Sequence, residues 1–488
     1  MPAPQNLAQI DHFIVLMMEN RSFDHILGFQ LPSNLGGLSG NEFNLADPVL
    51  PDGARVQVGP SISYGMPFDP GHEFADVQRQ LYGPVGAAGL PSMCGFLYSA
   101  LNPPPASPVP NLTDASRVLQ CFQPAQLPVL STLAAQFAVA NGWYSSLPGP
   151  TWPNRFFIHA ATSGGLTESP NDQEVIRGYS FDAGTLYDRL SGAGLDWRIY
   201  HDGLPQTAGI QSLRTEYIDP LTERFRDMTA FASDVASGRL PHYVFIEPDY
   251  DTGNNYQGGN SMHPLNDVRR GEDLIRSVYE TVRNSAYWTN AMLIITFDEH
   301  GGFFDHCFPP ASVPTGDDYR YATPGRGFGF DRYGVRVPNV IISAYTAPGT
   351  ILDGLNNPNL VFDHASVLAT AELRFGLEPL TDRDKKANTL IAALNLADAR
   401  DDAPSKLPAA PPDLNVPPAP VPPAAQATSP LSDNQQSFLA LATACKLGMA
   451  DDPSTHSAIW NAHQAVQNQQ QAANYIAALE SQIIAQRQ

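Results

Sequence analysis

Charged residues, and basic residues in particular, are scarce in this chain of 488 residues. Only 16% of the residues are charged, and 28 Lys and Arg stand against 49 Asp and Glu, so the net charge is −21. A field of this sign repels duplex nucleic acid and anionic bilayers, whose non-specific binding depends on neutralising phosphates. We therefore expect no nucleic-acid partner, and any phosphate-bearing substrate has to be recognised locally.

Long apolar runs are also absent. The longest, residues 291–297, is far shorter than the roughly 20 residues of a membrane-spanning helix, so we expect no transmembrane segment and at most peripheral membrane contact. The first residues lack the basic region and the apolar core of a secretory signal. Localisation stays open between the cytoplasm and secretion with a signal that is absent from this sequence.

Cysteine is the third scarce feature. Cys94, Cys121, Cys307 and Cys445 lie far apart and form no C-x-x-C pattern for zinc. We expect mostly reduced thiols, with a Cys94–Cys121 bridge as the one plausible exception in an oxidising compartment.

What is present predicts a globular protein with three parts. Apolar residues make up 43% of the chain, with 45 Pro and 38 Gly, which is typical of a loop-rich globular protein. Residues 404–430 contain ten prolines and favour extended polyproline structure, whereas Ile476, Leu479 and Ile483 follow helical spacing. We expect one large domain over 1–400, a proline-rich linker or surface strap over 401–430, and a docked helical tail over 431–488.

Four short apolar runs without alternation end at turn or helix signals, as strands buried on both faces do. Helix-like stretches lie between them. Strands that alternate with helices predict a doubly wound α/β fold, with a mostly parallel sheet and helices on both faces. We expect strands at 13–18, 243–246, 292–297 and 340–344, and helices at 131–137, 185–191, 268–283 and 364–374.

Polar residues follow three of these strands directly. They are Glu19 and Asn20 after the first strand, Glu247 after the second, and Asp298, Glu299 and His300 after the third. In open α/β sheets, ligands bind outside the carboxyl ends of the strands. We therefore expect these segments to meet at one edge of a single domain that spans at least residues 10–375.

Acidic residues packed at one edge would repel each other without a cation between them. Glu19, Asn20, Asp298 and Glu299 offer the hard oxygen ligands that a divalent metal ion prefers, and Ca²⁺, Mg²⁺, Mn²⁺ and Zn²⁺ all remain candidates. An isolated Asp-Glu pair at a strand end is more often a helix cap or a surface acid. The segments that accompany this pair weigh against that simpler interpretation.

The segment GPTWPNR, residues 149–155, places the Thr151 hydroxyl just ahead of a helix expected at 155–161. A helix N-terminus stabilises anions, and Arg155 can bind a phosphate with two N–H groups. A hydroxyl in this place is a nucleophile if a metal lowers its pKa. For Thr151 taken alone, a helix N-cap is the simpler alternative.

Histidines recur in similar motifs. They are His72 in DPGH with Asp69, His263 before a proline, and His300 and His306 in DEHGGFFDH. A histidine beside an acid can bind a metal or transfer a proton near neutral pH, whereas a lone histidine is more often structural. We assign that structural role to His12, His25, His159, His201 and His242.

Four strings resemble the phospholipase C and acid phosphatase family of phosphoesterases, which is related to the alkaline phosphatase superfamily. They are MMENRSFDH (17–25), DPGH (69–72), GPTWPNR (149–155) and FDEHGGFFDH (297–306). FDHASVLATAEL and LTDRD extend the resemblance over roughly residues 10–390. The threonine in GPTWPNR is similar to that of the non-specific phospholipases C, since acid phosphatases of the family have serine there. The resemblance implies an alkaline phosphatase-like fold and a metal-dependent hydrolase.

The resemblance also implies a role for each candidate residue. Glu19, Asn20, Asp298 and Glu299 would hold the metal, and Thr151 would contact it and act as the nucleophile. His72 and His263 would steady the phosphoryl group or protonate the leaving oxygen. Asp69 would orient His72, and Arg155 would stabilise the equatorial oxygens. The remaining candidates, Glu247, His300 and His306, would support the site or bind substrate.

The implied reaction has two steps. Thr151 attacks phosphorus while a histidine protonates the leaving alcohol, and water then hydrolyses the phosphothreonine. The leading hypothesis is a phospholipase C that cleaves glycerophospholipids to diacylglycerol and a phosphorylated head group. The alternative is a broad acid phosphatase that acts on monoesters, and a remote one is a non-catalytic binding protein with the same fold.

Overall fold

The computed structural model describes residues 6–50, 52–84, 89–90, 92–103, 109–251, 256, 258–323, 327–411, 431 and 433–487. A large sheet lies at its centre. Its strands are β1 (His12–Met18), β6 (Ala138–Ala140), β7 (Trp197–His201), β8 (Phe225–Asp227), β9 (Tyr243–Glu247), β10 (Ala291–Phe297), β11 (Asn339–Ser343) and β12 (Thr350–Leu352).

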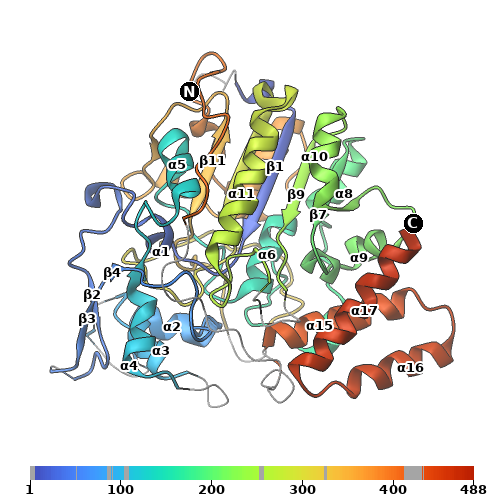
Figure 1. The fold of residues 1–488 in the computed structure, drawn as a ribbon, viewed down its shortest axis with the longest axis horizontal. Helices are drawn as coiled ribbons and strands as arrows, with labels where there is room; N and C mark the ends of the chain where they lie inside the picture. Colours follow the sequence, from blue (N-terminus) through green and yellow to red (C-terminus); the bar gives the residue numbers. More distant parts are fainter. Residues whose placement is uncertain are drawn as a thin grey trace.

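The strands of this sheet lie in the order β12-β6-β11-β10-β1-β9-β7-β8 (Figure 1). Neighbouring strands are parallel, except that β11 is antiparallel to both β10 and β6. Strands β9, β10 and β11 are buried along their whole length, which explains why their sequences are mostly apolar. The predicted mostly parallel sheet and its four predicted strands are confirmed.

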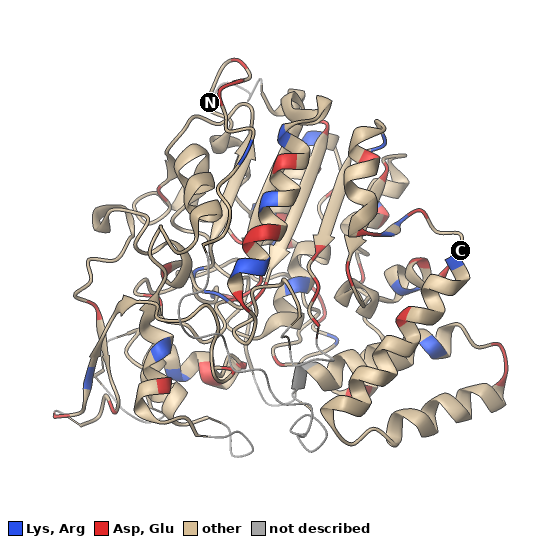
Figure 2. Ribbon diagram, in the orientation of Figure 1, with Lys and Arg blue, Asp and Glu red and all other residues tan. Residues whose placement is uncertain are grey.

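Helices cover both faces of the sheet, as predicted. Helices α5 (Pro128–Gln136), α10 (Met228–Ala236) and α11 (Val268–Arg283) lie in front of the strands in Figure 1. Helices α6 (Thr151–Ala160), α8 (Leu186–Gly192) and α12 (Ala365–Phe375) cover the other face, where α6 contacts both α8 and α12. Basic and acidic bands alternate along α11 (Figure 2), so no single sign of charge gathers on it.

Helix α6 begins earlier than the sequence predicts. Its first residue is Thr151 rather than Arg155, and Pro150 is the N-cap. Pro153 occupies the first turn, where backbone N–H groups have no acceptor within the helix and proline is tolerated. The correction moves Thr151 into the helix itself.

A smaller apolar cluster lies beside the sheet, at the lower left of Figure 1. Its elements are α2 (Phe74–Tyr82), α3 (Phe96–Leu101), α4 (Leu112–Ala115) and the short sheets β2 (Phe43–Leu45) with β3 (Arg55–Gln57) and β4 (Gly59–Pro60) with β5 (Gln120–Cys121). Phe303 and Phe304 of the FDEHGGFFDH segment pack into this cluster. Cys94 and Cys121 are free thiols, as are Cys307 and Cys445, so the structure contains no Cys94–Cys121 bridge.

The C-terminal part begins as a segment that runs along α11. Arg283 Nε donates to the Ala403 carbonyl (3.0 Å) and the Tyr279 hydroxyl donates to the Pro404 carbonyl (2.6 Å). The rest of the predicted proline-rich segment, 412–430, lies outside the described residues. Beyond it, α15 (Asp433–Gly448), α16 (Pro453–Gln464) and α17 (Gln469–Arg487) form the predicted helical tail. Within the described chain, no helix combines the length and apolar character that crossing a membrane requires.

Candidate active site

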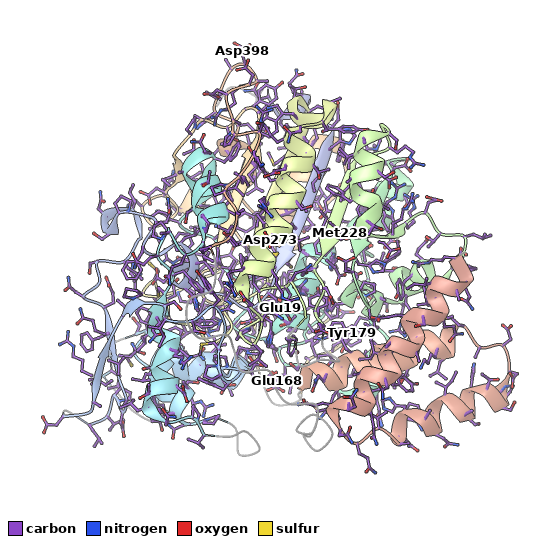
Figure 3. All side chains as sticks on the ribbon, viewed as in Figure 1. Glu19, Glu168, Tyr179, Met228, Asp273 and Asp398 are labelled. Carbon is purple, nitrogen blue, oxygen red and sulfur yellow. The ribbon has the colours of Figure 1, made fainter. Side chains whose placement is uncertain are left out.

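The ends of β1 and β10 bring two acidic segments together. Met18 pairs with Phe297 in the register of these strands, so Glu19 and Asp298 leave the sheet side by side. The Asn20 amide donates to Asp298 Oδ1 (2.9 Å) although the two residues are 278 positions apart. Figure 3 shows Glu19 beyond this end of the sheet. The predicted meeting of the two segments is confirmed.

Backbone strain at this edge explains the first glycine of the FDEHGG string. Asn20 has a φ of 56° and Gly301 a φ of 63°, both in the left-handed region. A Cβ atom on Gly301 would lie 2.1 Å from the Asn20 carbonyl oxygen. Glycine is therefore required at 301 for the two segments to approach this closely.

Three carboxyl groups lie fully buried at this edge, those of Glu19, Asp298 and Glu299. Burial, together with the charge of Asp298, raises the pKa of Glu19 to about 7 and that of Glu299 to about 8, against the opposing charges of His263 and His72 respectively. Glu299 Oε1 has no hydrogen-bond partner among the described residues. A divalent cation would relieve both the repulsion and the unpaired oxygen, so the donor set fits one.

Thr151 faces this group of donors. Its Oγ1 atom donates to Asn20 Oδ1 over 3.3 Å, and the residue is 5% exposed. Because Pro150 occupies the N-cap position, Thr151 is the first residue of α6 and not its cap. The simpler interpretation of Thr151 as an N-cap is therefore wrong, and the hydroxyl is left facing Asn20 beside the helix N-terminus.

Arg155 lies one turn further along α6 and is fully buried. Its Nε atom donates to Asp298 Oδ2 (3.0 Å) and Nη2 donates to the Met18 carbonyl (3.1 Å). The ring of Tyr250 lies 5.1 Å from the guanidinium carbon. Arg155 therefore holds Asp298 in place. Its Nη1 atom is buried and has no hydrogen-bond partner among the described residues.

His72 and His263 flank the carboxyl groups from two different loops. His72 Nδ1 donates to the Pro70 carbonyl (2.8 Å), and its Nε2 lies 3.4 Å from Asn20 Nδ2. Burial lowers the pKa of His72, but the charges of Glu299 and Asp69 outweigh it and raise the value to about 10. The His263 ring stacks on Tyr256 with centroids 3.7 Å apart.

Asp69 corrects one sequence-based expectation. It lies 3.5 Å from His263 Nε2, whereas the Nδ1 atom of His72 is already bonded to Pro70, two residues earlier in the same turn. Burial raises the pKa of Asp69, but the charge and hydrogen bond of His263 outweigh burial, with smaller contributions from His72 and Arg21. The net effect is a pKa below the usual value. Asp69 therefore orients His263 rather than His72.

Two other candidates are structural supports. Glu247 accepts hydrogen bonds from the amides of Gln206 and Thr207 (2.7 and 2.9 Å) and from the Tyr250 hydroxyl (2.9 Å), so its carboxylate is occupied. His300 Nε2 donates to Gln80 Oε1 (2.7 Å), and burial lowers the pKa of His300 to about 3.

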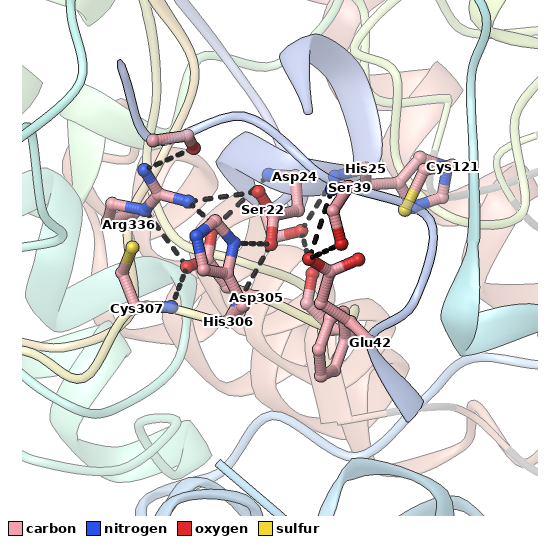
Figure 4. Close-up of polar contacts among 12 residues, drawn as sticks. Ser22, Asp24, His25, Ser39, Glu42, Cys121, Asp305, His306, Cys307 and Arg336 are labelled. Atoms are coloured by element: carbon pink, nitrogen blue, oxygen red, sulfur yellow. Dashed lines mark hydrogen bonds and ion pairs between the residues drawn. The ribbon is translucent and has the colours of Figure 1, made fainter. Parts of the chain in front are cut away.

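His306 belongs to a separate ion-pair cluster (Figure 4). Arg336 donates to Asp24 Oδ1 and to Asp305 Oδ1, both over 2.9 Å, and His306 Nδ1 donates to Asp24 Oδ2 (2.7 Å). The possible ligand atoms of Asp305, His306 and Cys307 lie within 4.8 Å of one another, but Arg336 already supplies positive charge there. This cluster fastens the FDEHGGFFDH segment to α1 (Phe23–Leu27), so of the two roles expected for His306, support of the site and substrate binding, these contacts favour support.

Several residues of the motifs support the site in ways the sequence alone does not reveal. Asn154 Nδ2 donates to the carbonyls of Gly149 and Pro150 (2.8 and 3.1 Å), immediately before Thr151. His364, in FDHASVL, donates from Nε2 to the Asp298 carbonyl (2.7 Å). Arg383, in LTDRD, donates to the Ser146 carbonyl (3.0 Å) in the same loop. The motifs were visible in the sequence, but these partners depend on packing.

Comparison with known proteins shows the family of this chain. A model of the Phosphoesterase family matches residues 10–378. The chain belongs to the phosphoesterase family. It is 37% identical over 407 residues to non-specific phospholipase C6 of Arabidopsis thaliana, which covers 81% of this chain and 74% of that protein. It is 28% identical over 445 residues to phospholipase C B of Mycobacterium tuberculosis (strain ATCC 25618 / H37Rv), covering 81% and 80%.

Among solved structures, an alkaline phosphatase superfamily protein from Vibrio parahaemolyticus overlaps 54% of this chain and 64% of that chain, at 15% identity and a TM-score of 0.34. Phosphoesterases are phosphoric ester hydrolases, so family membership makes this chain an enzyme of that class. The tail helices α15–α17 lie beyond the residues that the family model matches.

Proposed function

We propose that this phosphoesterase is phospholipase C-like and hydrolyses the phosphodiester of glycerophospholipids, releasing diacylglycerol and a phosphorylated head group. The observation that carries the proposal is the Thr151 hydroxyl, 3.3 Å from Asn20 Oδ1 at the N-terminus of α6. The names of the relatives from Arabidopsis and Mycobacterium support the choice of substrate.

Glu19, Asn20, Asp298 and Glu299, with Thr151, are the residues that would hold a divalent metal ion. When bound, the ion supplies the positive charge that lowers the pKa of a hydroxyl and stabilises the oxygens of a transferred phosphoryl group. Arg155 keeps Asp298 oriented for that role through its Nε–Oδ2 hydrogen bond. Metal analysis of protein purified without a metal-affinity resin would identify the metal.

In the first step, Thr151 Oγ1 releases its proton to solvent and forms a bond to phosphorus, and the bond from phosphorus to the glycerol oxygen breaks. The leaving oxygen takes a proton from a histidine. His263, oriented by Asp69, and His72 are placed for this transfer, one from each flank of the site. The backbone N–H groups at the start of α6 stabilise the negative charge of the phosphoryl oxygens.

In the second step, water attacks the phosphothreonine. A new bond forms between phosphorus and the water oxygen while the bond to Thr151 Oγ1 breaks. The threonine oxygen regains a proton from solvent, and the head group leaves with its phosphate attached. The first-step histidine, now without its proton, accepts the proton that the water loses.

The test of the nucleophile is Thr151→Ala. We expect loss of kcat by at least about a thousandfold, because removing a nucleophile leaves only binding and electrostatic stabilisation. Thr151→Ser is the matched control and should retain part of the activity, since it keeps the hydroxyl. Activity of Thr151→Ala close to that of the unchanged protein would contradict the assignment.

The choice of substrate is tested by parallel assays on phosphatidylcholine and on p-nitrophenyl phosphate. Release of diacylglycerol and phosphocholine at a higher kcat/KM than p-nitrophenol supports the phospholipase proposal. Release of free phosphate from monoesters alone would favour the acid phosphatase alternative. A lack of turnover on both substrates in the presence of each candidate metal would favour the non-catalytic alternative.

A further inference from the structure

The helical tail reaches the residues that surround Thr151 and Arg155. Phe438, on α15, is 2% exposed. Its ring contacts Trp152 edge-on, with centroids 6.1 Å apart, and contacts Tyr250 at 5.2 Å. Trp152 directly follows Thr151, and Tyr250 packs against the Arg155 guanidinium. One tail side chain therefore contacts a neighbour of each of these two residues.

Trp152 is held tightly on its other side. A Cβ atom on Gly209 would lie 2.5 Å from the Trp152 ring. The short helix η4 (Gln206–Gly209) therefore packs directly against this ring, with no space for a side chain between them. With η4 on one side and Phe438 on another, the Trp152 ring has a defined position in the first turn of α6. Displacement of this ring would move the helix N-terminus that carries Thr151.

Tyr250, in contrast, has empty space beside it. A cavity of about 310 Å³ lies between the tail and the large domain, and its lining includes Leu204, Tyr250, Phe438 and Ile476. Loss of the Phe438 ring would enlarge this cavity and let Tyr250 move away from Arg155. Since Arg155 orients Asp298, the disturbance would reach the proposed metal ligands.

The helix that carries Phe438 is itself firmly docked. Helix α15 contacts α7 (Asp172–Arg177), α9 (Gln211–Ile218), η4 and α17. Ser437 Oγ donates to the Pro170 carbonyl (3.3 Å), and Leu441 is fully buried. The position of the Phe438 ring is therefore set by a firmly docked helix, α15, and not by one flexible side chain.

We propose that Phe438 is a positioning residue of the active site, so that the C-terminal tail is part of the catalytic unit. The proposal rests on the proposed function, because it acts through Thr151 and Arg155. Phe438 keeps Trp152 and Tyr250 in place and thereby sets the geometry of the nucleophile and of Asp298. A displacement of about 1 Å at reacting groups is enough to lower a rate by up to a hundredfold.

The test measures kcat and KM of Phe438→Ala in the full chain, with saturating metal and well below its melting temperature. We expect kcat to fall by about tenfold or more while KM changes by less than about threefold, since orientation rather than substrate binding is lost. Phe438→Tyr should keep kcat within about twofold of the unchanged protein, because it keeps the aromatic ring that contacts Trp152 and Tyr250.

Leu479→Ala is the matched control, because Leu479 is a fully buried residue of α17 in the same tail. It should lower the melting temperature as Phe438→Ala does but leave kcat within about twofold of the unchanged protein. Equal loss of kcat in Leu479→Ala and Phe438→Ala would overturn the inference, since the tail would then act through stability alone.

Unchanged kcat in Phe438→Ala, together with an inactive Thr151→Ala, would overturn the inference and leave the proposed function standing. An active Thr151→Ala would overturn the proposed function, and the positioning role would fall with it. These outcomes separate the two proposals.

Discussion

Arg336 neutralises two buried carboxylates that lie far apart in the chain. Asp24 and Asp305 are separated by 281 positions, and each accepts a hydrogen bond from its guanidinium. His306 adds a second cation to the same cluster. At the scale of single residues, this cluster shows that the acidic residue of a sequence motif can belong to a structural ion pair. A buried carboxylate is stable in its charged form only when a partner of opposite charge lies beside it.

The cluster leads to a prediction on pH and stability. Burial lowers the pKa of His306, but its hydrogen bonds and the charge of Asp24 outweigh burial and raise the value to about 11. Its contribution to stability is therefore fully present below the unfolded pKa of about 6.5 and is lost as the pH rises toward 11. We expect His306→Gln to lower the free energy of unfolding by about 2 kcal/mol at pH 6 and by less at pH 10.

Urea denaturation of both proteins at the two pH values measures this difference. His456→Gln is the control. His456 lies on the exposed helix α16, and its ring bonds to the neutral Ala450 carbonyl instead of to a carboxylate. A difference for His306→Gln that stays constant or grows between pH 6 and pH 10 would show that the Asp24 pairing is not what stabilises the charged ring.

At the scale of elements, helix α6 is the part on which the site depends most. The loop before it is held by Asn154, which lies inside the helix and reaches back to Gly149 and Pro150. The sequence-based prediction placed the start of this helix at Arg155, four residues too late. The loop-to-helix hydrogen bonds, and not helix propensity, set the start at Thr151.

Asn154→Ala should therefore reduce activity as well as stability. We expect kcat to fall by about tenfold or more, since Thr151 loses its fixed position, and the free energy of unfolding to fall by about 1–3 kcal/mol, since buried carbonyls lose a donor. Enzyme kinetics and urea denaturation measure the two effects.

Asn111→Ala is the matched control for this variant. Asn111 caps α4 in the smaller apolar cluster, so its loss should cost about 1 kcal/mol of stability with unchanged kcat. If Asn154→Ala lost stability but kept full kcat, the loop would not position the nucleophile.

At the scale of the whole molecule, a net charge of −21 surrounds a site built for phosphate. Three carboxyl groups lie buried at that site, and burial raises the pKa of two of them, Glu19 and Glu299. A single bound divalent cation would offset most of the local negative charge without changing the surface. The overall charge and a phosphoester substrate are therefore compatible.

Metal binding should appear as stabilisation of the fold. We expect removal of metal by a chelator to lower the melting temperature, and re-addition of metal at about a hundredfold over its Kd to restore about 2.7 kcal/mol of stability. Asp298→Asn should weaken this response, whereas Asp273→Asn on α11 should not. A response that His306→Gln abolishes would place the ion at Asp305, His306 and Cys307 instead.

The sequence by itself determined the four central strands of the sheet and the acidic residues at its edge. The continuously apolar runs identified the strands β1, β9, β10 and β11, because a strand that is buried on both faces does not alternate polar and apolar residues. The residues that follow β1 and β10 identified the site, since the carboxyl ends of parallel strands meet at one edge. Both are local signals that need no knowledge of distant partners.

The tertiary structure alone decided which side chains act together. It paired Asp69 with His263, placed His306 in the Arg336 cluster, made Thr151 the first residue of α6, and brought Phe438 of the tail against Trp152 and Tyr250. These pairings join residues up to several hundred positions apart. They depend on how buried groups satisfy their hydrogen bonds and fill space in the packed molecule, which no local pattern records.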